Sequence, residues 1–199
     1  IPAAWGGEQD GSLVNLEGRL QRMTVGAGAP DEVRAPLRWI AGLALVATGG
    51  YGRADLYPYS DVDVMLLLPS GHQAADHPSL RAGIERFISS SWDAGLEIAA
   101  SVRSIDEALS LAARDVTVQT ALLEARHITG LSTLLGALHE QFAQQLDAQA
   151  FITAKRQETE QRHEKYEHTP YALEPNCKES PGGLRDLQLI NWMVRASGL

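Results

Sequence analysis

Two aspartates separated by one residue are the side chains of this sequence best placed to do chemistry. Asp61 and Asp63 open an apolar segment, residues 61–68, which is rich in Val and Leu and stops at Pro69. This composition predicts a β-strand, on which alternate side chains share a face, so both carboxylates project from the same face. Two adjacent carboxylates raise each other's pKa unless a cation lies between them. Because Mg²⁺ prefers carboxylate and phosphate oxygens, the pair could hold magnesium against a triphosphate.

A pair of glycines precedes this strand. Gly49 and Gly50 follow an apolar segment, residues 43–47, which we expect to be a buried strand that ends in a tight turn. Glycine has no Cβ, so its backbone N–H groups can approach a phosphate closely. Arg53 and Ser60 lie in the connector and can donate hydrogen bonds to phosphate oxygens. Alone, each motif is more often a solvated strand end or an ordinary turn, but their combination predicts a triphosphate and metal site.

The surrounding pattern predicts an α/β fold that is followed by a helical region. The expected elements after the aspartates are a helix over residues 80–92, a strand over 96–102, a helix N-capped by Ser104 with Glu107, a helix over 117–125, helices over 131–149 and 151–166, a loop over 169–183 and a helix from Leu184. We therefore predict one domain over residues 1–130, with a poorly defined segment 1–30, and the start of a helical domain over 131–199.

Composition and charge exclude several classes of protein. The chain has 199 residues, of which 44% are hydrophobic and 21% charged, a globular balance. Its formal net charge of -8 argues against bulk binding of nucleic acid, which requires a positive surface. The longest apolar run is far too short for a membrane span, and the first residues lack a secretory signal pattern. The single cysteine excludes an intrachain disulfide, and we expect a cytoplasmic protein.

Two long motifs resemble those of a known family. Residues 49–63, GGYGRADLYPYSDVD, resemble the signature of the DNA polymerase β-like nucleotidyltransferases, and more closely the N-terminal region of the bacterial PII uridylyltransferases. Residues 171–186, YALEPNCKESPGGLRD, are similar to the loop that leads into that family's helical region, and residues 101–104 also fit. The resemblance implies a small mixed-sheet nucleotidyltransferase domain and extends from about residue 37 to residue 199.

The resemblance also implies a reaction. UMP would pass from UTP to a tyrosine hydroxyl of the nitrogen regulatory protein PII, with release of pyrophosphate and with Mg²⁺ as cofactor. Asp61 and Asp63 would bind the metal, stabilising the charge on the α-phosphate and on the leaving group. The residues implied to hold the β- and γ-phosphates are Gly49 and Gly50, with help from Arg53 and Ser60.

Lys178 and Arg185 are further candidates for binding the triphosphate. They flank residues 181–183, Pro-Gly-Gly, where the loop can bend back toward the nucleotide. A simple helix start with Asp186 in its first turn explains these residues equally well.

No decisive motif marks a third metal-binding carboxylate in this sequence. The superfamily often has one on a later strand, and Glu97 is the candidate, with Asp93 less favoured. An exposed strand residue is at least as good an interpretation of Glu97. The family commonly shows Gly-His before Ser-Val-Arg, whereas this chain has Ala99 and Ala100, which removes a polar contact near the site.

Other functions compete with this interpretation. One is a related adenylyltransferase, such as the enzyme that acts on glutamine synthetase, whose motif also ends in Ser-Asp-x-Asp. Another is a catalytically silent module that binds a nucleotide or a protein. The family's uridylyl-removing and glutamine-sensing domains are not expected in this chain, and His163 is interpreted as a solvated helix residue.

Overall fold

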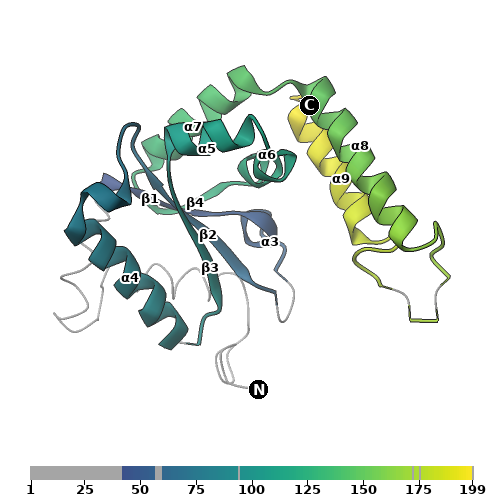
Figure 1. Cartoon of the computed structure of the whole chain (residues 1–199), viewed down its shortest axis with the longest axis horizontal. Helices are drawn as coiled ribbons and strands as arrows, with labels where there is room; N and C mark the ends of the chain where they lie inside the picture. The colour runs from purple at the N-terminus through teal and green to yellow at the C-terminus, as the bar shows by residue number, and fades with distance from the viewer. Residues whose placement is uncertain (1–41, 57–59, 94, 172, 175, 199) are drawn as a thin grey trace.

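A mixed β-sheet forms the centre of the structure. The computed structural model describes residues 42–56, 60–93, 95–171, 173–174 and 176–198, so the predicted segment 1–30 lies outside it. Within these residues the strands are β1 (Ala44–Ala47), β2 (Val62–Leu68), β3 (Ile98–Ser104) and β4 (Arg126–Gly130). They form one sheet in the order β3-β2-β1-β4 (Figure 1). Strand β1 pairs antiparallel with β2 and β4, whereas β2 and β3 are parallel.

Helices cover both faces of this sheet. On one face, α4 (Pro78–Asp93) packs against Val62, Val64 and Leu66 of β2, beside the short 3₁₀ helix η3 (Ala74–Asp76). On the other face, Met65 and Leu67 pack against a layer of helices. These helices are α5 (Ile105–Ala112), α6 (Val116–Leu123) and α7 (Ser132–Gln145). Figure 1 shows α4 on one side of the sheet and α5 and α7 on the other. Burial on both faces explains the nearly continuous apolar run of β2.

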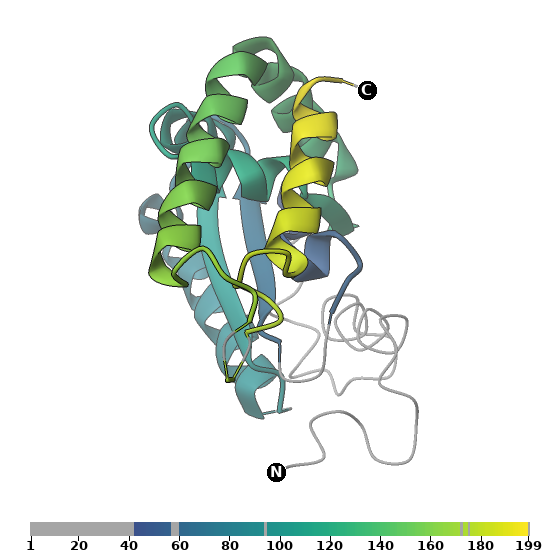
Figure 2. The same cartoon turned by 90° about the vertical axis from the view of Figure 1, so that its right-hand side faces the viewer.

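Two further helices stand beside the sheet. Helices α8 (Ala148–Lys165) and α9 (Leu184–Ala196) pack side by side, and the loop between them joins their lower ends (Figure 2). Both contact α6, and α9 buries Trp192 in this region. The helical pair therefore faces the end of β2 at which the two aspartates lie. No described helix is long and apolar enough to cross a membrane.

Most of the predicted elements are confirmed. The α/β fold with a mixed sheet and following helices is observed, and the Ser104 cap forms a complete capping box with Glu107. The strand predicted over 96–102 lies two residues later. Residues 126–130 were not predicted to form a strand, because apart from the buried Ile128 they are polar or small, and their pairing with β1 is a tertiary contact. The boundary at residue 130 stays a prediction.

Candidate active site

The glycine pair forms a helical turn rather than the expected tight turn. The helix α3 (Gly49–Gly52) directly follows β1, with hydrogen bonds from Gly52 N–H to the Thr48 carbonyl (2.8 Å) and from Arg53 N–H to the Gly49 carbonyl (3.1 Å). Gly49 has a φ of +57°, a conformation that favours glycine. A Cβ at this position would lie 2.5 Å from Asp63 Oδ2. The glycine therefore brings the α3 backbone against the Asp63 carboxylate.

A second glycine places α3 directly on the end of α6. A Cβ at Gly52 would lie 2.3 Å from the backbone oxygen of Glu124 and 3.0 Å from that of Ala47. Neither neighbour is a flexible side-chain end that could move aside. The Gly52 position thus fixes the distance between α3 and the residue that caps α6.

Asp63 lies in an acidic, partly buried environment. Burial raises the pKa of its carboxyl group, and the charges of Asp61 and Glu124 raise it further, while Arg53 and Lys178 act in the opposite direction. A cation between Asp61 and Asp63 would stabilise both side chains in their charged, carboxylate form. Among the described residues, no group of three or more His, Cys, Asp or Glu side chains could hold a metal ion. A divalent ion here would therefore need oxygens from the nucleotide as well as the two aspartates.

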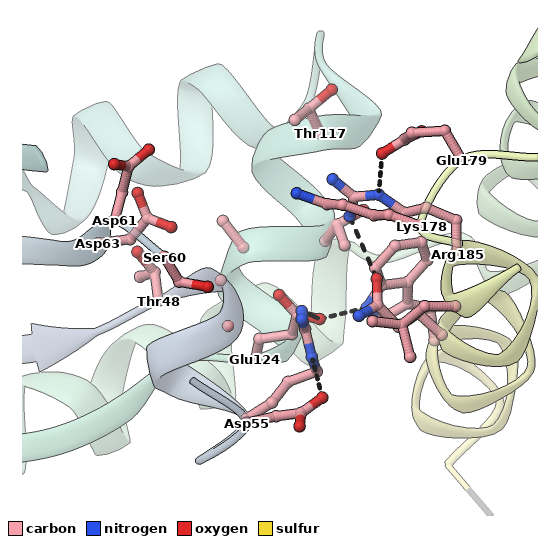
Figure 3. Close-up of a pocket in the computed structure, with 18 of the residues that line it drawn as sticks. Thr48, Asp55, Ser60, Asp61, Asp63, Thr117, Glu124, Lys178, Glu179 and Arg185 are labelled. Carbon is pink, nitrogen blue, oxygen red and sulfur yellow. Dashed lines mark hydrogen bonds and ion pairs between the residues drawn. The ribbon is translucent and has the colours of Figure 1, made fainter. Parts of the chain in front are cut away.

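One cavity of ≈ 970 Å³ brings most of the predicted residues together. It lies between the end of β2, α3, α6 and the α8–α9 pair. The predicted residues that line it are Gly49, Gly50, Arg53, Ser60, Asp61, Asp63, Lys178 and Arg185. Figure 3 shows Asp61 and Asp63 on one side of this cavity, with Lys178 and Arg185 reaching in from the opposite side. The cavity thus combines residues of the two sequence motifs, 49–63 and 171–186, which lie more than 100 positions apart.

Glu97 is not among the residues that line the cavity. Its side chain is exposed, and its backbone oxygen accepts a hydrogen bond from Val62 N–H at 3.2 Å. The strand register pairs Asp63 with Ala99, so the residue of β3 beside Asp63 carries only a methyl group. A third metal-binding carboxylate at Glu97 stays a prediction.

The cations of the cavity differ in whether they have an acidic partner. Four cations that line the cavity form ion pairs. Three of the partners also line it: Glu124 for Arg53 (2.6 Å), Glu158 for Lys155 (2.9 Å) and Glu179 for Arg185 (3.2 Å). Arg162 pairs with Asp186, which is not a lining residue (2.5 Å). Lys178, by contrast, has no ion pair with any described carboxylate, and its charge lowers the pKa of Asp63. Lys178, in the loop, therefore has a side chain available for a phosphate, while Arg185, in the first turn of α9, is already engaged.

The loop that carries Lys178 is held in place by its own hydrogen bonds. Asn176 Oδ1 accepts from the N–H groups of Lys178 and Glu179, both at 3.0 Å. Asp186 accepts from Arg162 Nη2 and, at 2.6 Å, from Gly182 N–H. Burial alone would raise the pKa of Asp186, but these hydrogen bonds and the charge of Arg162 lower it below its usual value.

His163 belongs to the same network. Its Nε2 atom lies 3.0 Å from Asp186 Oδ1, and the His163 side chain is 22% exposed. The interpretation of His163 as a solvated helix residue was therefore wrong. It links α8 to Asp186 in the first turn of α9.

Sequence reasoning missed a buried carboxylate, Glu124, in the wall of the cavity. Its side chain is only 3% exposed and accepts hydrogen bonds from Arg53 Nη1 (2.6 Å) and from the indole N–H of Trp192. Glu124 thereby joins α3, α6 and α9. Nothing in the local sequence pattern indicates this role, because both partners lie about 70 positions away.

Comparisons with known proteins show which proteins the chain resembles. A family described as "GlnD PII-uridylyltransferase" matches residues 150–198, which include most of α8 and all of α9. A "Bifunctional uridylyltransferase/uridylyl-removing enzyme" from Burkholderia orbicola (strain AU 1054) is 58% identical over 158 residues. The protein of the same name from Cupriavidus pinatubonensis is 56% identical over 159 residues.

Over the part that it shares with them, the chain is similar to these uridylyltransferases. The match to the Burkholderia relative covers 79% of this chain but only 18% of that relative. The match to the Cupriavidus relative covers 80% of this chain and 18% of that relative. The chain thus spans less than a fifth of the length of these relatives.

Proposed function

We propose that this chain transfers UMP from UTP to a tyrosine hydroxyl of the signalling protein PII and releases pyrophosphate. The observation that carries the proposal is the shared cavity, in which Asp61 and Asp63 face Lys178 across the glycine-rich α3. The names of the 54–58% identical relatives support uridylyl transfer rather than another nucleotidyl transfer. The match to a PII-uridylyltransferase family supports PII as the acceptor.

Mg²⁺ fits the residues that are present. Asp61 and Asp63 would hold it, because their carboxylates are hard oxygen ligands, and a cation between them would offset the burial and the neighbouring acidic charges that raise the pKa of Asp63. When bound, the ion would neutralise charge on the phosphates and on the attacking oxygen. The absence of a Cβ at Gly49 lets the α3 backbone lie against the Asp63 carboxylate, since a Cβ would lie 2.5 Å from its Oδ2 atom.

The chain's own residues orient the reactants. The phenol oxygen of the acceptor tyrosine forms a bond to the α-phosphorus, and the bond from that phosphorus to the oxygen bridging to the β-phosphate breaks. The phenol proton is lost to solvent, and pyrophosphate leaves with the bridging oxygen. Lys178 donates hydrogen bonds to the leaving phosphates, and Arg53, anchored by Glu124, keeps α3 in place beneath them.

The test measures UMP transfer directly. Wild-type protein is incubated with PII, Mg²⁺ and either UTP or ATP, and both the mass of PII and the released pyrophosphate are recorded. We expect one added UMP with UTP, and no transfer by Asp63→Asn under the same conditions. Transfer of AMP in preference to UMP would instead support the adenylyltransferase alternative, and undiminished transfer by Asp63→Asn would refute the role of the aspartates.

A further inference from the structure

The wall of the cavity formed by α9 presents an ordered pair of polar side chains. Arg185 Nη1 donates to Gln188 Oε1 at 3.3 Å, and Arg185 Nε donates to Glu179 Oε1 at 3.2 Å. The Arg185 guanidinium also lies 5.9 Å from the centre of the Trp192 ring. Both Arg185 and Gln188 line the same cavity as the two aspartates, and Gln188 is 4% exposed. Arg185 lies at the side of the cavity opposite Asp63 (Figure 3), and its hydrogen bond holds the Gln188 amide beside it.

These contacts fix the orientation of the Gln188 amide. An arginine side chain has only donors, so the amide atom that faces Arg185 must be the oxygen. The amide nitrogen then points away from Arg185 and has two N–H groups to offer. No described residue accepts a hydrogen bond from this nitrogen. Gln188 thus offers amide N–H donors to the cavity.

We propose that Gln188, oriented by Arg185, contacts the base of the bound nucleotide and selects a keto group over an amino group. The inference rests on the proposed function, because it assigns the base end of the same nucleotide site. Uracil presents a carbonyl oxygen at C4, which accepts from the amide N–H. Cytosine has the same size but an amino group at C4, which would place two donors against each other and leave both unsatisfied. UTP is therefore preferred to CTP.

The placement of the other residues agrees with this assignment. Asp63 and α3 lie on one side of the cavity, and Lys178 reaches toward them from the side of Arg185 (Figure 3). The base of an extended nucleotide whose phosphates lie at Asp63 and α3 can therefore reach the wall formed by α9. Thr120 and Ala121 of α6 form the neighbouring wall, and the Thr120 hydroxyl already donates to the Val116 carbonyl at 2.8 Å. Gln188, by contrast, has amide N–H groups that no described residue uses, and these could distinguish the bases.

The test compares the affinities for UTP and CTP by isothermal titration calorimetry with Mg²⁺, which requires no PII and no turnover. Gln188→Glu keeps the shape of the side chain but turns the free amide nitrogen into an acceptor. We expect the wild-type protein to prefer UTP, and the ratio of the two affinities to fall about tenfold or more in this variant. Gln188→Met removes the donor without adding an acceptor and should bring the ratio close to one. Gln144→Glu makes the same change on the exposed surface of α7 and should leave the ratio unchanged.

The outcomes separate this inference from the proposed function. Equal affinities of the wild-type protein for UTP and CTP would overturn the role of Gln188, as would an unchanged ratio in both the Glu and the Met variant. Neither result depends on whether PII is modified. The proposed function fails instead if the protein binds UTP but adds no UMP to PII.

Discussion

Replacing Glu124 by Gln tests how the glycine-rich α3 is held to the helical pair. The substitution keeps the shape of the side chain and removes its charge. Glu124 is 3% exposed and pairs with Arg53, which is 14% exposed, at 2.6 Å. Its carboxylate also accepts the indole N–H of Trp192. The change therefore leaves the Arg53 guanidinium largely buried without its main counter-charge.

The expected loss of stability follows from this burial. Removing one partner of a buried ion pair costs about 3–5 kcal/mol, because the other charge stays buried without compensation. Here Asp55 lies 4.0 Å from Arg53 Nε and is partly exposed, so it offsets some of this cost. The amide oxygen of glutamine can also still accept from Trp192. We expect a decrease of about 2–4 kcal/mol in the free energy of unfolding.

The assay is urea unfolding at pH 7, followed by far-UV circular dichroism. The matched control is Glu85→Gln, which makes the same change in an ion pair with Arg81 at 2.9 Å whose side chains are 63% and 69% exposed. We expect the control to lose less than about 0.5 kcal/mol, because exposed pairs contribute little. If Glu124→Gln is no more destabilised than Glu85→Gln, the buried link between α3 and α9 does not stabilise the fold, and this reasoning is wrong.

Three further predictions concern the same region. Gly52→Ala places a Cβ 2.3 Å from a backbone oxygen, so we expect a loss of about 1–3 kcal/mol in urea unfolding, and an unchanged midpoint would contradict the close packing of α3. Lys178→Met should raise the KM for UTP about tenfold or more with an unchanged urea midpoint, since it removes a charged hydrogen bond; an unaltered KM would show that Lys178 does not bind the nucleotide. Asp186 has a lowered pKa in the folded protein, so its stabilising effect is present above the ordinary carboxyl pKa of 3.8 and is lost as the pH falls below it. The difference in unfolding free energy between wild type and Asp186→Asn should therefore shrink between pH 7 and pH 3, and a constant difference would contradict the role of its hydrogen bonds.

The sequence predicts the parts of the site that depend on local pattern. The apolar run that follows Asp61 predicts a strand, and side-chain alternation places the aspartates on one face. Lys178 could be proposed only from its flanking motif, because its approach to Asp63 depends on how α8 and α9 pack beside the sheet. The preference for Lys178 over Arg185 came from the structure, which shows that Glu179 already binds the arginine.

The missed features depend on contacts between distant segments. Glu124 could not be assigned from sequence because its partners, Arg53 and Trp192, lie about 70 positions before and after it. The sequence of β4 shows only a weak strand pattern, and this strand forms by pairing with the edge of β1. The helical form of α3 was missed because Gly-Gly usually indicates a turn, and its helical hydrogen bonds depend on packing against α6.

The position of Trp192 gives the cavity an optical signal of its own. The ring lies 4.4 Å from the ammonium group of Lys155, and its N–H is bound to the Glu124 carboxylate. The emission energy of an indole depends on the charges around it, and a bound triphosphate brings several negative charges into the cavity that Trp192 lines. Of the other three tryptophans, Trp92 is 61% exposed and lies outside this cavity, and Trp5 and Trp39 lie outside the described residues. Nucleotide binding to the unlabelled protein can therefore be followed through the fluorescence of a native residue.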